Sequence, residues 1–168
     1  LAAHLTIAEA SDSEGKTLYT QVNMHSLKGK AVTWVNYDVD VMIPVNTAVE
    51  MISVGGWSGV KFRLKDSGAT LKLKNHRNSG VSDEAWVTKH FAESKVNLRK
   101  FNKSERDAIE GGLVEVGMSK DAVIVSRGYP PAHKTPSLNS SSWRYWNTRW
   151  NTILVNFDSN GKVSSIRD

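Results

Sequence analysis

The most constraining feature of this sequence is the rapid alternation of apolar and polar residues between positions 17 and 75. In WVNYDVDVMI, residues 34–43, every second position from Val35 to Ile43 carries an apolar side chain. This two-residue period is typical of a strand with one buried face. The same period returns in three further stretches separated by turn residues: AVEMISV (48–54), VKFRL (60–64) and TLKLK (70–74). Four or five short strands at this spacing predict a small barrel or sandwich.

Within this region, IPVNTAVEMISVGG (43–56) resembles the strand-and-turn rhythm of bacterial SH3-like barrels. The resemblance implies a small SH3-like β domain, which we assign to residues 17–95. We expect a helix over SDEAWVTKHFAE (82–93) to close it, because Ser82 is a suitable N-cap and two acidic residues follow in the first turn. Residues 1–16 are expected to form an N-terminal tail.

Residues 96–168 predict two helices followed by three strands. SERDAIEGG (104–112) begins with a pattern similar to a capping box, with Ser104 as the cap, and ends in two glycines. A second helix is expected after Ser119, ending at Gly128 because prolines follow. The period of two then returns in three short segments: SWRYW, NTILVNFD and GKVSSI.

The pattern of this second part resembles the SmpA/OmlA family of BamE-like outer-membrane assembly lipoproteins. The motifs are Gly-Met-Ser before a short helix, Gly-x-Pro after it, an aromatic strand, and a final hairpin. The resemblance implies an α+β fold, in which the SH3-like barrel precedes a BamE-like domain of two helices and a three-stranded antiparallel sheet. The matching residues are Gly117, Met118, Ser119, Val123, Gly128, Pro130, Trp143, Tyr145, Phe157, Gly161 and Val163.

Composition excludes several classes of protein. The chain has no cysteine, and therefore no disulfide, thiolate nucleophile or cysteine-bound metal. No apolar run approaches the roughly 18 residues of a membrane span, and residues 1–16 lack the basic and apolar regions of a secretion signal. The net charge of +5 is not gathered in a cationic run, so we expect no nucleic-acid partner.

We expect no catalytic residue, metal or cofactor. The five histidines (His4, His25, His76, His90 and His133) show no spacing typical of metal ligands. His133 lies near the serines at 137 and 140–142, but no acid or nucleophile elbow accompanies them. Asp38 and Asp40 would share one strand face, where two solvated carboxylates are more common than a cation site.

One group of cations predicts a binding face. In residues 60–65 and 70–74, basic residues alternate with Phe and Leu. All the cations would therefore lie on one sheet face. Two interpretations stay open: a solvated face balanced by Asp38 and Asp40, or a site for phospholipid headgroups or an anionic cell-wall polymer. The residues are Lys61, Arg63, Lys65, Lys72 and Lys74.

A second group combines Trp and Arg, residue types enriched in binding hot spots. Alternation sends Trp143 and Tyr145 towards the helices and Arg144 and Trp146 to the other face. This face either binds a protein partner or is covered by the first domain, and both interpretations stay open. The candidate residues are His133, Trp143, Arg144, Trp146, Arg149 and Trp150.

From these features and the family resemblance we expect a non-enzymatic binding or assembly module of the cell envelope. Its partner would be an envelope protein, and anionic lipid or cell-wall polymer would be a further ligand. The resemblance implies a periplasmic or outer-membrane-associated location, with any lipid anchor on a preceding segment. Three alternatives stay open: a secreted inhibitor that binds a hydrolase through residues 129–142 and the aromatic strand, a module for an anionic polymer alone, and an enzyme of another type.

Overall fold

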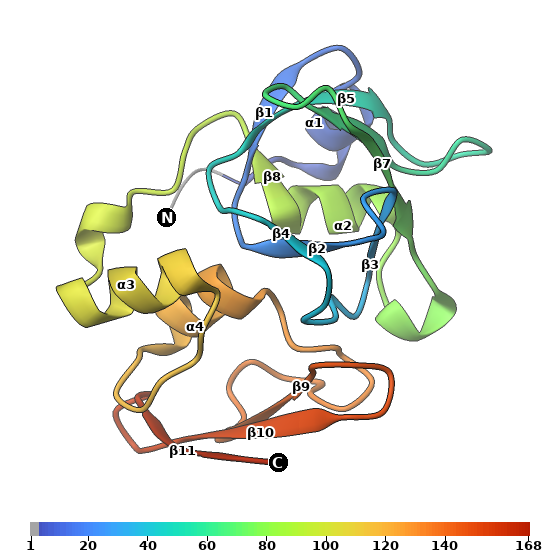
Figure 1. The fold of residues 1–168 in the computed structure, drawn as a ribbon. Coiled ribbons are helices and arrows are strands. Elements are labelled where there is room, and N and C mark those ends of the chain that lie inside the picture. The colour runs from blue at the N-terminus through green and yellow to red at the C-terminus, as the bar shows by residue number, and fades with distance from the viewer. Residues whose placement is uncertain (1–3) are drawn as a thin grey trace.

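A computed structural model describes residues 4–168 (Figure 1). The helices are α1 (Ile7–Ser11), α2 (Asp83–His90), α3 (Lys103–Gly111) and α4 (Lys120–Arg127), with two 3-10 turns, η1 (Arg77–Ser79) and η2 (Leu98–Lys100). The strands are β1 (Thr17–Thr20), β2 (Met24–Leu27), β3 (Ala31–Thr33), β4 (Val41–Ile43), β5 (Ala48–Ser53), β6 (Lys61–Leu64), β7 (Thr70–Lys74), β8 (Phe91–Ala92), β9 (Ser142–Trp146), β10 (Thr152–Phe157) and β11 (Val163–Arg167).

The first eight strands form one curled mixed sheet in the order β4-β2-β3-β7-β6-β5-β1-β8. Neighbours are antiparallel except β3 and β7, which run parallel. The apolar positions of the alternating strands point inward and meet helix α2, so that Leu18, Met51, Phe62, Leu71 and Trp86 belong to one core. Ala10 of α1 also belongs to it, although residues 1–16 were expected to be a tail. Residues 1–3 of that expected tail lie outside the described residues.

The last three strands form a separate antiparallel sheet in the order β11-β10-β9 (Figure 1, bottom). Trp143 and Tyr145 of β9, together with Val155 and Phe157 of β10, face helices α3 and α4 and build a second core with them. This alternation follows from the two-residue period of the strands. A tight turn that includes Gly161, with a φ of 71°, joins β10 to β11.

The expected fold class is wrong. The chain is mostly sheet, with an eight-stranded and a three-stranded sheet and only about 22% helix, which conflicts with an SH3-like barrel followed by a BamE-like two-helix domain. Helices α3 and α4 end at Gly112 and Gly128, as the glycines predicted. The difference lies in the first part of the chain, where the residues after His90 become strand β8, pair with β1 and extend the first sheet.

Two further local predictions need correction. Residues 34–43 do not form one strand, because Asn36 and Asp40 adopt left-handed conformations and only β4 remains extended. The capping box of α3 is formed by Asn102 with Glu105, not by Ser104. The predicted N-caps Ser82 of α2 and Ser119 of α4 are confirmed.

Buried polar side chains join the two cores. The Asn23 side-chain amide donates to the carbonyls of Ile109 (2.7 Å) and Ser126 (3.1 Å). The Asn36 amide donates to the Asn23 carbonyl (3.1 Å) and the Arg127 carbonyl (3.0 Å). Three of these four hydrogen bonds reach backbone carbonyls of α3 and α4, so they fix how the two cores meet. No helix in residues 4–168 has the length and apolarity to cross a membrane.

Candidate functional site: a basic sheet face

The five predicted cations lie on β6, on β7 and at the start of the turn between them. Phe62 and Leu71 are buried in the first core, whereas Arg63, Lys65, Lys72 and Lys74 are exposed. The register places Lys61 directly opposite Lys72. The structure therefore brings the predicted cations together on the outer face of the sheet, which we call the basic face.

The basic face is only partly neutralised by the protein. The Arg63 guanidinium pairs with the Glu50 carboxylate of β5 at 3.0 Å, and the Lys65 ammonium donates to the Thr17 hydroxyl. The ion pairs within residues 4–168 include neither Lys61 nor Lys72. Opposite residues of an antiparallel pair have Cβ atoms about 5 Å apart, so this lysine pair is mutually repulsive.

Asp38 and Asp40, which were expected to balance these cations, lie elsewhere. Asp38 is 3.2 Å from the His25 imidazole, and Asp40 accepts the Lys28 backbone N–H. Both precede β4 in an irregular segment rather than a strand beside β6. Asp38 and Asp40 therefore do not balance the cations of the basic face.

A tryptophan that sequence reasoning did not single out lies at one end of the basic face. Trp57 is fully exposed in the β5–β6 loop, which projects from the body of the molecule (Figure 1). The backbone carbonyl of Val60, just after the loop, accepts a hydrogen bond from the Leu73 backbone N–H. This contact places Lys74, the next residue, beside the loop. The sequence GGWSG (55–59) could have indicated this position, because a tryptophan flanked by glycines seldom lies in a regular strand that would bury its ring.

The Trp–Arg group divides into buried and accessible members. Trp143 is fully buried in the second core, so its ring is not accessible to a partner protein. Arg144 and Trp146 are half-buried on the opposite face, and the Arg144 guanidinium donates to the Thr152 hydroxyl. Arg149 and Trp150 are exposed in the β9–β10 loop, where the guanidinium lies 5.2 Å from the Trp150 ring.

His133 joins the aromatic residues of the two parts of the chain. Its ring centroid lies 5.2 Å from that of Trp34, after β3, and 5.0 Å from that of Trp146, in β9. Partial burial and the nearby Lys134 lower the pKa of His133. Trp146 is therefore covered in part by its own chain, and a partner there would meet a continuous aromatic surface that includes Trp34.

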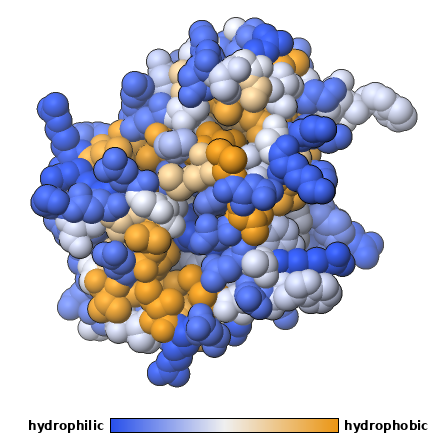
Figure 2. All heavy atoms as spheres, in the orientation of Figure 1, coloured by the Kyte–Doolittle hydropathy of each residue, from blue (hydrophilic) through white to orange (hydrophobic). Residues whose placement is uncertain are grey.

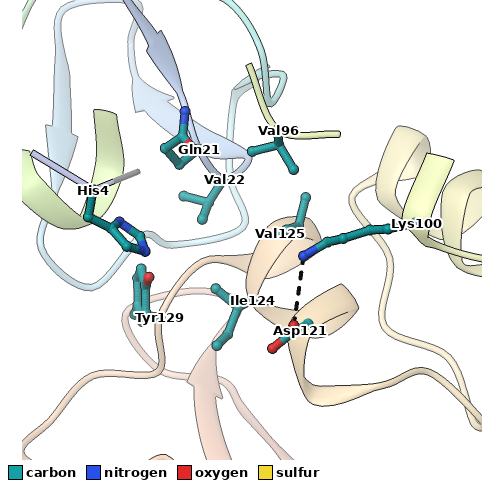
Figure 3. A pocket seen from close by; sticks show the side chains of 9 residues that line it. All are labelled: His4, Gln21, Val22, Val96, Lys100, Asp121, Ile124, Val125 and Tyr129. Atoms are coloured by element: carbon teal, nitrogen blue, oxygen red, sulfur yellow. Dashed lines mark ion pairs between the residues drawn. The ribbon is translucent and has the colours of Figure 1, made fainter. Parts of the chain in front are cut away.

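The cavity between the two cores is small. It encloses about 80 Å³ between the residues that follow strand β1 and helix α4, far below the volume of a small-molecule site. Figure 3 shows His4 and Tyr129 on one side of it and the Lys100–Asp121 ion pair on the other, with 3.7 Å between Nζ and Oδ2. Gln21 and the side chains of three valines and Ile124 line the remainder, so the cavity is a small and mostly apolar gap at the junction.

The remaining histidines have structural partners. The His90 imidazole stacks on Trp86 with 4.0 Å between ring centroids, and its Nδ1 lies 2.7 Å from the Trp86 carbonyl. Burial lowers the pKa of His90 to about 4. Burial also lowers the pKa of His25, against an opposing effect of Asp38. No group of three His, Cys, Asp or Glu in the described part of the chain could hold a metal ion.

Comparison of the chain with protein-family models, curated proteins and solved structures finds no significant match. The resemblance of residues 100–168 to the SmpA/OmlA family therefore stays a prediction. The basic face has to be interpreted from its own geometry.

Proposed function

We propose that this protein is a binding module that docks its basic face on closely spaced phosphate groups, such as anionic lipid headgroups or a phosphate polymer. The observation that carries the proposal is the opposed pair Lys61 and Lys72, which has no carboxylate partner among residues 4–168. Like charges directly opposite each other destabilise a sheet. An anion bound between them would remove this repulsion.

The surroundings of this pair support contact with an extended surface rather than with one small anion. Lys74 and Lys65 continue the row of cations towards the two ends of β6 and β7. Trp57 lies at one end, and exposed Trp is favoured at the boundary between water and lipid. Each lysine near an anionic surface contributes about 1 kcal/mol of binding free energy.

The test compares binding of the full chain to two probes: linear polyphosphate, and vesicles of phosphatidylcholine with and without phosphatidylserine. We expect binding to one or both anionic probes that weakens as ionic strength rises. The variant Lys61→Thr/Lys72→Thr should bind about tenfold to thirtyfold more weakly. Trp57→Ala should weaken binding to vesicles but not to polyphosphate, which separates the lipid source of phosphate from the soluble one.

The matched control is Lys103→Thr/Lys134→Thr, which removes the same charge from α3 and from residues 129–142. Both lysines are exposed, and neither belongs to the first sheet. If the control loses as much affinity as Lys61→Thr/Lys72→Thr, net charge alone drives binding and the proposal fails. Absence of binding to both anionic probes at low salt would also overturn it.

A cell-envelope setting, a periplasmic location and a non-enzymatic role stay predictions from the sequence. They are compatible with the proposal, because anionic lipids and phosphate polymers are both envelope components. A protein partner at the Arg149–Trp150 loop would be an addition to this activity and would not replace it.

A further inference from the structure

A polar cavity, which we call the Trp150 cavity, lies beside the loop that joins β9 to β10. Its volume is about 480 Å³, within the range typical of small-molecule sites. Its lining combines one aromatic ring with four polar side chains: Asn147, Trp150, Asn151, Thr152 and Asp168. The loop supplies three of them, β10 supplies Thr152, and Asp168 follows β11. The cavity is therefore separate from the basic face, which lies on the first sheet.

The Trp150 ring is exposed but held in place. Its side chain is 82% exposed, and the Arg149 guanidinium lies over the ring, 5.2 Å from its centroid. This cation–π contact favours one orientation of the indole and leaves its other face open. The loop backbone is also fixed, because the Thr148 hydroxyl accepts from the backbone N–H groups of Trp150 (3.2 Å) and Asn151 (3.1 Å). The free face of the indole is therefore a positioned platform for a flat ligand.

Two of the polar side chains are oriented by arginines and keep donors for a ligand. The Asn147 side-chain oxygen accepts from the buried Arg127 guanidinium at 3.1 Å. A guanidinium only donates, so the amide N–H groups of Asn147 are left without this partner. In the same way, the Thr152 hydroxyl accepts from the Arg144 guanidinium at 2.9 Å and keeps its own hydrogen as a donor.

Asn151 and Asp168 add acceptors to these donors. Both side chains are exposed, and the ion pairs within residues 4–168 do not include Asp168. The loop uses only the backbone of Asn151, whose carbonyl accepts from the backbone N–H groups of Asn147 and Thr148. The Trp150 cavity therefore presents donors and acceptors together, next to the open face of an indole ring.

This combination fits the chemistry of a sugar. A hydroxyl group both donates and accepts, so neighbouring hydroxyls can pair with the amides, the hydroxyl and the carboxylate of the lining. The C–H groups on the flat side of a sugar ring carry a slight positive charge and pack on the negative face of an indole. A phosphate group, in contrast, has no such face, and the carboxylate of Asp168 would repel it.

The surroundings disfavour two other ligands that use an exposed tryptophan. Single-stranded nucleic acid needs cations along its backbone, but no Lys or Arg lines the Trp150 cavity. At a protein–protein hot spot, contacts that exclude water surround the tryptophan. Figure 2 shows pale and hydrophilic residues over the β9–β10 loop, at the lower right, whereas hydrophobic residues gather at the lower left. The exposed indole therefore lies in polar surroundings, as a sugar requires.

We propose that the Trp150 cavity binds one sugar unit of a neutral glycan, which stacks on the open face of the indole and pairs its hydroxyls with the polar lining. This site does not depend on the proposed function of the basic face. The two activities also differ in their response to salt, because screening weakens the binding of phosphate groups by lysines but not the binding of an uncharged sugar.

The test applies the full chain to an array of neutral oligosaccharides of glucose, mannose, galactose or N-acetylglucosamine, with oligothymidylate as a further probe. We expect binding to at least one neutral oligosaccharide, with an affinity that stays constant as the NaCl concentration rises. Titration with that oligosaccharide should shift the indole N–H NMR signal of Trp150 and the side-chain amide signals of Asn147 and Asn151. Trp150→Ala should weaken binding at least tenfold, and Asn151→Ala about tenfold.

Trp57→Ala is the matched control, because Trp57 is also exposed in a loop but does not line the Trp150 cavity. It should bind the oligosaccharide with unchanged affinity. Trp150→Phe keeps a flat ring and should lose less affinity than Trp150→Ala. Failure of every neutral oligosaccharide to bind, equal losses in Trp57→Ala and Trp150→Ala, or Trp150-dependent binding of oligothymidylate alone would overturn the proposal. None of these results would affect the polyphosphate and vesicle measurements on the basic face.

Discussion

Charged side chains in two regions of this protein differ in whether the chain supplies partners for them. At the junction of the two cores, Arg127 is only 2% exposed and donates to the carbonyls of Asn36 (3.3 Å) and Trp146 (3.1 Å) and to the Asn147 side-chain oxygen (3.1 Å). On the basic face, by contrast, Lys61 is held opposite another lysine, and no ion pair of the described residues includes either of them.

Glu105 follows the same rule as Arg127. Burial alone would raise the pKa of this carboxyl, but hydrogen bonds from Ser119 and Asn102 and the Lys162 ammonium outweigh that effect and lower it. Buried charges in this fold therefore have partners within the chain. The lysines of the basic face lack them, and this difference distinguishes a charge that maintains the fold from one available to a ligand.

Replacing Arg127 should break the junction and have the largest effect. In Arg127→Met, the carbonyls of Asn36 and Trp146 lose their donor, and each unsatisfied buried acceptor costs about 1–3 kcal/mol. Met has a similar reach but no donor, so the loss is not mainly one of volume. We expect the free energy of unfolding to fall by about 3 kcal/mol in urea denaturation. An unchanged or higher value would show that the buried charge costs as much as it contributes.

The junction was beyond the reach of sequence analysis, for an identifiable physical reason. Arg127 looked like the last helical residue before Gly128, where a cation is expected in solvent beside the helix C-terminus. Asn36 looked like the polar position of an alternating strand. Their meeting depends on a left-handed turn at Asn36 (φ 54°) and on the approach of two sheets, and neither produces a local pattern.

Features set by local physical chemistry were predicted correctly. Ser82 and Ser119 cap helices as expected, and the cations of β6 and β7 share one face because side chains alternate. The strand count was missed because β1, β2 and β3 have only three or four residues each and β8 has two and follows a helix. The parallel pairing of β3 with β7 was missed because it joins segments far apart in sequence. Trp57 was missed because glycine pairs were interpreted only as turns.

Lowering the pH should test the burial of His90, with the next largest effect. Burial lowers the pKa of His90 to about 4, below the value near 6.5 of an unfolded histidine. The unfolded state then binds more protons, so stability is full above pH 6.5 and is lost as the pH falls towards 4. In wild type we expect a loss on the order of 2 kcal/mol between pH 7 and 5.

The control for this titration is His90→Gln, which keeps a donor for the Trp86 carbonyl but cannot be protonated. Its free energy of unfolding should change much less between pH 7 and 5. Any slope that remains would come from His25 and His133, whose pKa values burial also lowers. Equal slopes for wild type and His90→Gln would show that His90 is not buried as a neutral group.

The smallest expected effect concerns the basic face, where a substitution should raise the free energy of unfolding instead of lowering it. Lys61→Thr removes the repulsion with Lys72 and places a β-favouring residue in β6, so the free energy of unfolding should rise by about 0.5 kcal/mol. Arg63→Thr is the matched change two residues away, and it should lower stability by a similar amount because it breaks the pair with Glu50. Both differences should shrink in 1 M salt, where the screening length is about 3 Å. If instead Lys61→Thr destabilises the protein at low salt, Lys61 has an internal partner, and the distinction between structural and available charges fails at this position.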